Sequence, residues 1–199
     1  HKDLGRVFVP EAFKKMISLP GAPTRRAVHG EQGIFVATQR RRNEQGFWET
    51  LWASITHNER VDMGSDIQVN TEFGTVGTAR AGVLSAMAIA NGTLTKTKTD
   101  LSLGVITASV TTNEYTTIGL ARTTATIQNK VAPSTLGGTY SVDAYKSFTV
   151  SGAGGTAFGG GLFDSTTVAG SHLYVEDNFA STAVLVSGDT LNVTVTITN

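Results

Sequence analysis

The sequence contains no cysteine. This absence excludes disulfide bonds, cysteine nucleophiles and thiolate metal ligands, so the fold must be stabilised by packing, hydrogen bonding or assembly. No apolar run approaches the ~20 residues that a membrane-spanning helix needs. The charged residues among positions 1–20 do not fit a secretory signal peptide. We therefore expect no membrane association.

Motifs for metal binding and catalysis are also scarce. The four histidines have no metal-ligand spacing such as HExxH, and no segment has the DxDxDG spacing of a calcium loop. We expect Asp66 and Asp189 to cap turns. The sequence predicts a protein that is not an enzyme and has no cofactor. The residues considered as ligands are His1, His29, His57 and His172, and Asp62, Asp66, Asp100, Asp164, Glu176, Asp177 and Asp189.

Threonine and glycine are abundant instead. The chain has 30 threonines, 26 of them after residue 60, and 22 glycines. Threonine is β-branched and suits a pleated sheet, while glycine clusters mark turns. We interpret Gly159–Gly161 as strand positions where backbones approach closely, and Gly152–Gly155 as a flexible hairpin tip. This composition is typical of an all-β sandwich or barrel.

Apolar and polar residues alternate most clearly over 190–199, where Leu191, Val193, Val195 and Ile197 share one face. This period of two predicts a half-buried strand. With the other candidates it indicates a β-sandwich or jelly-roll-like domain over residues 61–199. The predicted strands of this domain are 66–70, 82–90, 104–110, 115–127, 139–151, 157–164, 171–179 and 190–199.

Residues 1–60 differ from the rest in composition and in the spacing of apolar residues, and we interpret them as an N-terminal arm and docking segment. A short helix is predicted over 10–18, with Phe13, Met16 and Ile17 at helical spacing. These three apolar residues cannot be buried by the segment alone. We expect them to pack on a neighbouring subunit or on the chain's own domain.

The second half of this segment contains both tryptophans. A strand is predicted over 33–39, followed by the turn-like 43–46 and then by 47–55, whose apolar spacing favours a helix. Trp48 and Trp52 are candidates for an interface, because tryptophan is enriched at binding hot spots. Membership of a core face is the alternative.

Charge is unevenly distributed although the net charge is zero. Residues 1–42 carry nine Lys/Arg and three Asp/Glu, whereas residues 131–199 carry one Lys/Arg and five Asp/Glu. Such polarity suits head-to-tail assembly or docking on a charged partner. Arg40, Arg41 and Arg42 form the strongest basic feature. A contact with an acidic protein surface or a solvated loop is favoured over nucleic acid, because no nucleic-acid-binding motif accompanies them.

Residues 84–199 resemble small β-domain structural proteins of tailed bacteriophages. The resemblance is carried by MAIANGTLTKTKTDLSLG, EYTTIGLARTTATI, KSFTV, GGGLFD, LYVEDNF and LVSGDTLNVTVTITN. In that family a similar order recurs: an ALGTGT strand and turn, a GLAR strand, a KTFTVTG strand, a GLFD turn and a final SGDTLTVTYTI strand. The family is taken as structural, and no catalytic residues come with the resemblance.

The resemblance implies a virion protein, assembled in the host cytoplasm. A capsid decoration or cement protein ranks first, with the major capsid protein as partner and the arm clasping a neighbouring subunit. A tail, baseplate or head-tail connector component, and a fibre-anchoring or glycan-binding module, are the alternatives. Homo-oligomerisation is expected, because most soluble assemblies are symmetric.

Overall fold

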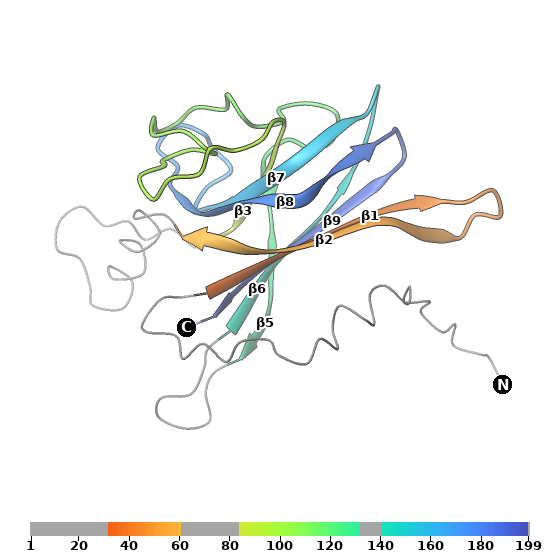
Figure 1. Ribbon diagram of the computed structural model, residues 1–199, viewed down its shortest axis with the longest axis horizontal. Helices are drawn as coiled ribbons and strands as arrows, with labels where there is room; N and C mark the ends of the chain where they lie inside the picture. The colour runs from red at the N-terminus through yellow and green to blue at the C-terminus, as the bar shows by residue number, and fades with distance from the viewer. Residues whose placement is uncertain (1–31, 61–83, 132–140, 199) are drawn as a thin grey trace. The chain divides into compact units, whose positions relative to one another are not determined.

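The computed structural model describes residues 32–60, 84–131 and 141–198, and these form nine β-strands and no helix (Figure 1). The prediction of an all-β domain is confirmed for these described residues. The helix predicted over 10–18 and the strand predicted over 66–70 lie outside the described residues. The strands are β1 (Gln32–Arg42), β2 (Trp48–Arg60), β3 (Ala86–Ala90), β4 (Thr123–Thr124), β5 (Thr126–Val131), β6 (Ser141–Thr149), β7 (Gly155–Phe163), β8 (Leu173–Leu185) and β9 (Thr190–Thr198).

All paired strands are antiparallel, and they form two sheets. The first sheet has the order β2-β1-β9-β6-β5, and the second has the order β4-β3-β7-β8. The end of β2 joins them, because Glu59 and Arg60 pair with Glu176 and Val175 of β8. Strand β2 therefore belongs to the first sheet along its length and contacts the second at its last residues.

The main core is contributed by both sheets. On β9, Leu191, Val193 and Val195 are fully buried and alternate with half-buried polar residues, which confirms the predicted strand. Phe35 of β1 lies against Phe179 of β8, with ring centroids 5.7 Å apart. The core also contains Ala37, Met87, Ile89, Ala144, Phe148, Leu162, Val175, Ala183 and Leu185. Burial of this apolar surface is the main stabilising contribution to the fold.

A smaller core lies under the irregular segment 91–122. Leu94 and Leu103 of this segment pack with Phe163, Leu173 and the alanines of β3. The strand predicted over 104–110 is wrong, and the one predicted over 115–127 is confirmed only at its end. Positive φ angles at Gly104, Ser109, Ile118 and Gly119 interrupt extended geometry in both. The segment forms turns instead.

The glycine run on β7 allows close approach, as predicted. A Cβ atom at Gly159 would lie 2.1 Å from the Asp177 carbonyl oxygen, and one at Gly160 would lie 2.5 Å from the Ala88 carbonyl oxygen. The interpretation of Gly152–Gly155 as a hairpin tip is wrong. These residues connect β6 to β7, which pair with different strands.

The first two strands belong to the β-domain. Strand β1 lies between β2 and β9 and pairs with β9 from Gln32 to Arg40. The chain divides into two units between Gly30 and Glu31. The helix predicted over 47–55 is also wrong, because these residues pair with β1 as a strand.

Candidate functional site

The hairpin of β1 and β2 extends beyond the rest of the first sheet (Figure 1). Pairing of β1 with β9 ends at Arg40, whereas pairing with β2 continues to Arg42, opposite Trp48. A β-bulge lies between Gln39 and Arg40. Bulges increase the local twist of a strand pair and re-aim its side chains. The end of the hairpin is therefore presented away from the sheet.

A well-bonded turn closes the hairpin. The Asn43 side-chain oxygen accepts hydrogen bonds from the backbone N–H of Gln45 (3.1 Å) and Phe47 (2.9 Å). The Asn43 N–H donates to the Phe47 carbonyl oxygen at 2.8 Å. Gly46 has a φ of +84°, which glycine adopts at no steric cost. These contacts fix the turn and explain why 47–55 continues as a strand.

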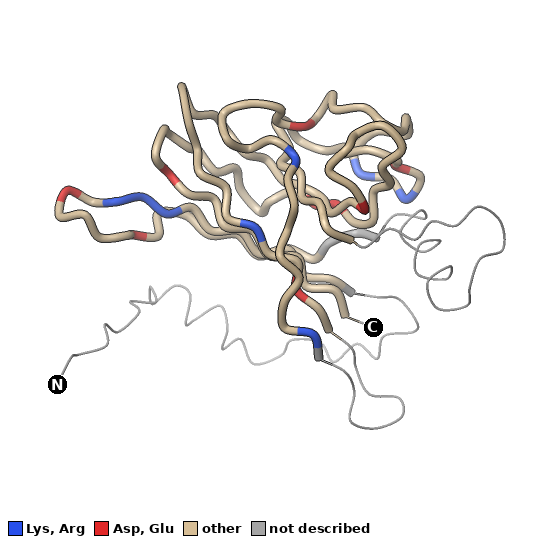
Figure 2. The backbone as a smooth tube through the Cα atoms, turned by 180° about the vertical axis from the view of Figure 1, so that it is seen from behind, with Lys and Arg blue, Asp and Glu red and all other residues tan. Residues whose placement is uncertain are grey.

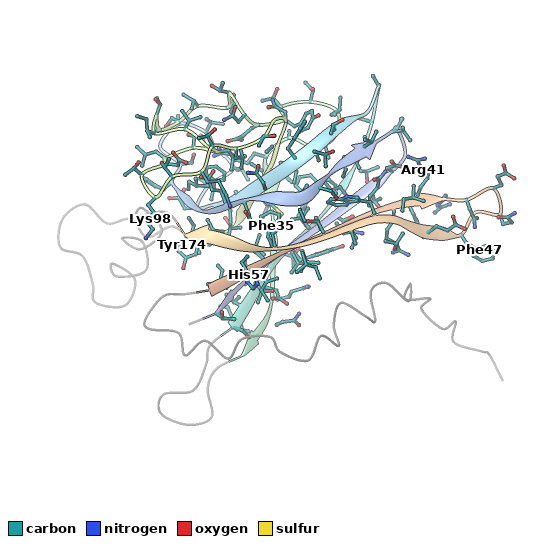
Figure 3. The ribbon with its side chains drawn as sticks, in the orientation of Figure 1. Phe35, Arg41, Phe47, His57, Lys98 and Tyr174 are labelled. Atoms are coloured by element: carbon teal, nitrogen blue, oxygen red, sulfur yellow. The ribbon has the colours of Figure 1, made fainter. Side chains whose placement is uncertain are left out.

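Apolar side chains at this end are exposed. Phe47 is 71% exposed, Leu51 is 49% exposed and Trp48 is 38% exposed; Phe47 extends from the end of the hairpin in Figure 3. The guanidinium carbons of Arg40 and Arg42 lie 5.8 and 5.2 Å from the Trp48 ring centroid. We call Arg40, Arg42, Phe47, Trp48 and Leu51 the tip surface. It contains exposed apolar side chains and two cations that lie beside Trp48, the composition of many protein-binding hot spots.

Arg41, between the two tip arginines, is anchored inward. Its Nε and one terminal nitrogen donate to the two carboxylate oxygens of Asp189, at 2.6 and 2.9 Å. Asp189 is fully buried and also accepts hydrogen bonds from Gln39 (2.7 Å) and the Val186 N–H (2.9 Å). The last bond confirms that Asp189 caps a turn. This network ties the hairpin to the turn between β8 and β9.

The charges of this network stabilise each other. The hydrogen bond from Arg41 is the largest cause that holds the pKa of Asp189 below its ordinary value. The same hydrogen bond raises the pKa of Arg41. The pair is bidentate, which gives it directional as well as electrostatic strength. Arg41 therefore helps to orient the hairpin, and its role as an interface residue stays a prediction.

The two tryptophans have different environments although they are on the same strand. The Trp52 Nε1 donates to the Ser181 Oγ at 2.9 Å, and its ring packs edge-on against Phe179 at 5.2 Å. Trp52 packs against the main core. Trp48 alone belongs to the tip surface. The candidate interface residues Phe13, Met16 and Ile17 lie outside the described residues.

A second cluster of buried charge lies between β8 and the segment 91–122. The Gly104 N–H donates to the Glu176 Oε2 at 2.7 Å. Burial, and then a side-chain hydrogen bond with Asp100, raises the pKa of Glu176 to about 8. Two carboxyl groups can share a hydrogen bond only if one is protonated. The raised pKa favours the protonated form of Glu176 at pH 7.

Other buried polar contacts attach the same segment to the second sheet. Lys96 donates to the Asp177 Oδ1, and Leu94 exchanges two hydrogen bonds with the Asn178 side chain. Arg122 forms an ion pair with Glu114 and lies over the Phe163 ring. These groups are used in holding the segment in place. Among the described side chains, no three His, Cys, Asp or Glu residues are arranged to hold a metal ion.

The described histidines are separate from the tip surface. His57 is exposed on β2, near the opposite end of the hairpin (Figure 3). The His172 Nδ1 lies 2.5 Å from the Asp164 Oδ2. His1 and His29 lie outside the described residues.

Comparison with known proteins gives no relative: the chain matches no protein-family profile, no curated protein and no solved structure. In the described ranges, no helix has the length and apolar character needed to cross a membrane.

The sequence interpretation missed Phe47 and Leu51 as parts of the tip surface. It also missed Asp189 as the partner of Arg41. A signal for the first was available, because a four-residue turn containing glycine between two β-compatible runs indicates a hairpin. The pairing of Arg41 with Asp189 spans 148 residues of sequence, and local patterns do not encode it.

Proposed function

We propose that the protein is a structural component of a tailed-phage virion, and specifically a capsid decoration or cement protein. The observation that carries the proposal is the tip surface, in which exposed aromatic and cationic side chains are held on paired strands beyond the sheet. A rigid, exposed apolar surface of this kind suits docking on another protein. The resemblance of residues 84–199 to phage structural proteins supplies the virion context.

We also propose that the two sheets form a β-sandwich with jelly-roll-like character. The main core supports this, since it takes side chains from β1, β6 and β9 of one sheet and from β3, β7 and β8 of the other. A sandwich with short connections is a stable platform for a projecting hairpin. In this proposal the domain supplies rigidity, and the tip surface supplies the contact.

The proposed mechanism is assembly without catalysis. Many copies bind the shell, each placing Phe47, Trp48 and Leu51 against the major capsid protein. Residues 1–24, including Phe13, Met16 and Ile17, clasp a neighbouring subunit. Ordering such an arm costs roughly 1–2 kcal/mol per residue in backbone entropy, so docking must supply many contacts. Homo-oligomers form on the particle.

Particles of the parent phage from which the gene has been deleted test this function. We expect them to assemble, to lose integrity at a lower temperature than complete particles, and to recover when purified protein is added back. Immunogold labelling should place the added protein on the head. Labelling of the tail or baseplate would contradict the decoration role, and absence from purified virions would contradict a virion role altogether.

A second addition experiment tests the arm. Protein that lacks residues 1–24 should keep its β-domain, as judged by circular dichroism, but should fail to restore the heat stability of the particles. Normal restoration would contradict the clasping role of the arm.

A further inference from the structure

The charges of the tip surface have no ion-pair partners among the residues that the structure describes. Arg40 and Arg42 contact the Trp48 ring, but neither forms an ion pair with any described residue. The neighbouring Arg41 is bonded to Asp189. The basic run is the blue stretch on the projecting hairpin in Figure 2. Two cations beside an exposed aromatic ring require carboxylates or another anion on whatever covers them.

Among the side chains that the structure describes, a second copy of the chain offers no exposed carboxylates outside the hairpin. The C-terminal part has a net negative charge in sequence, but the described carboxylates there are occupied internally. Asp143 and Asp164 are half-buried and bond to Asn129, Thr196 and His172. The buried carboxylates of the described residues are Asp100, Glu114, Glu176, Asp177 and Asp189. Head-to-tail pairing of a basic end with an acidic end therefore lacks an exposed acidic surface in the described domain.

Pairing of two tip surfaces is also unfavourable. Among the described side chains, the exposed carboxylates are Glu44 and Glu49, both on the hairpin. Glu49 lies directly opposite Arg41 in the strand register and accepts a hydrogen bond from Asn43. Side chains alternate between the faces of a strand, so Glu49 is on the opposite face from Arg40 and Arg42. Two tip surfaces in contact would bring four arginines together, and like charges repel.

We propose that the tip surface binds a different protein, one that presents an apolar depression bordered by carboxylates. This proposal rests on the proposed function, because it takes the partner to be a component of the virion. Trp48, which lies on the same face of the hairpin as Arg40 and Arg42, enters the depression, and the two arginines pair with the carboxylates at its border. Packing against Trp48 keeps the two guanidinium groups in position before contact, which lowers the entropy cost of binding. Nucleic acid is disfavoured because exposed Leu51 and Phe47 suit an apolar cavity.

The probe is the particle that lacks the protein, and the measurement is the binding of fluorescently labelled protein at rising NaCl. The variant R40S/R42S removes both free cations of the tip surface. The variant K98S/K130S is the control, since it removes the same charge from two exposed lysines elsewhere. Each variant is first shown to have the wild-type circular dichroism spectrum and melting temperature.

We expect R40S/R42S to bind about tenfold more weakly than wild type at low salt, and K98S/K130S to bind as wild type does. Wild-type affinity should fall between about 0.05 and 0.5 M NaCl, and R40S/R42S should lose most of this dependence. The variant W48A should also bind about tenfold more weakly while it retains the salt dependence.

Three results would overturn the proposal while leaving the virion role intact. They are equal binding by R40S/R42S and K98S/K130S, self-association of the purified chain that W48A abolishes, and R40S/R42S-sensitive binding of a labelled single-stranded DNA. Failure of the wild-type protein to bind the particles would instead contradict the proposed function, and the partner assignment with it.

Discussion

The two ends of the β1–β2 hairpin differ in burial although they belong to the same two strands. At one end Phe35 is completely buried in the main core, whereas at the other end Phe47 is 71% exposed (Figure 3). The sheet continues over the first end and stops before the second. One continuous strand pair therefore contributes to stability at its buried end and is free to contact a partner at its exposed end.

Each end is also associated with a buried carboxyl group, and the two groups have opposite pKa shifts. Near the exposed end, the pKa of Asp189 is lowered because Arg41 donates hydrogen bonds to it. At the buried end, Glu176 of β8 lies opposite Glu59 of β2 in the backbone register. The pKa of Glu176 is raised to about 8, mainly by burial. Asp189 is bonded to a cation, which favours its ionised form, whereas the burial of Glu176 favours its protonated form.

The largest expected difference is between two phenylalanine truncations. F35A should lower the free energy of unfolding by about 4 kcal/mol, because it leaves a cavity beside Phe179 in the core. F47A should change it by less than about 0.5 kcal/mol, because the ring is largely in solvent. Urea denaturation followed by circular dichroism measures both. Similar losses in the two variants would contradict the contrast between the ends.

The next effect concerns the anchor of the exposed end. D189A should lower the free energy of unfolding by about 3 kcal/mol, because the buried Gln39 amide and the Val186 N–H lose a charged acceptor. It should also weaken tip binding by misplacing the hairpin.

The Arg41–Asp189 pair also predicts how the stability of the fold changes at low pH. Because the folded-state pKa of Asp189 lies below its ordinary value of 3.8, its stabilisation is present above that pH and is lost as the pH falls through the lowered pKa. Urea midpoints between pH 2 and pH 6 should therefore fall less steeply at low pH in D189A than in wild type. An unchanged acid dependence would show that the pair contributes little.

The tryptophans give a smaller contrast. W52A should lower the free energy of unfolding by about 2 kcal/mol, since Trp52 is partly buried and packs edge-on against Phe179. W48A should lower the free energy of unfolding by less than about 0.5 kcal/mol, yet it should weaken binding to the particle. Thermal melts paired with the particle-binding assay separate the two effects. Loss of stability in W48A without loss of binding would reverse the assignment.

At pH 5 we expect E176Q to change the free energy of unfolding very little. Folded Glu176 keeps a proton that the unfolded chain releases, so wild-type stability should fall as the pH rises from about 4.5 to about 8. Glutamine can donate to Asp100 and accept from the Gly104 N–H without titrating. E176Q should match wild type within about 0.5 kcal/mol at pH 5 and exceed it at pH 9. A wild-type slope that persists in E176Q would assign the titration to another group.

The sequence was sufficient for the elements whose pattern is local. The strict alternation of 190–199 and the glycine run of β7 predicted strand and close approach correctly, because each is a direct consequence of pleated geometry. The same reasoning was wrong for 47–55, where the spacing of two tryptophans suited a helix. Pairing with β1 and the Asn43 turn decided the outcome there, and both depend on partners that the segment itself does not contain.

The candidate site was predictable in part for the same reason. The residue types alone made Arg40, Arg41, Arg42, Trp48 and Trp52 candidates for an interface, because arginine and tryptophan are enriched at binding hot spots. The sequence does not show that Arg41, unlike Arg40 and Arg42, is bonded to Asp189. It also does not show that Trp52, unlike Trp48, packs against Phe179. Both partners are distant in sequence, so only the fold reveals which side chains are already in use.

The most direct test of the tip surface is photo-crosslinking in the assembled particle. A photoreactive phenylalanine analogue replaces Phe47 in one variant and Ile106 in another, because the two side chains are similarly exposed, at 71% and 66%, but only the first is on the hairpin. The account predicts that the Phe47 variant crosslinks to a second virion protein and that the Ile106 variant does not. Crosslinking from Ile106 alone, or from Phe47 only to another copy of the chain, would contradict it.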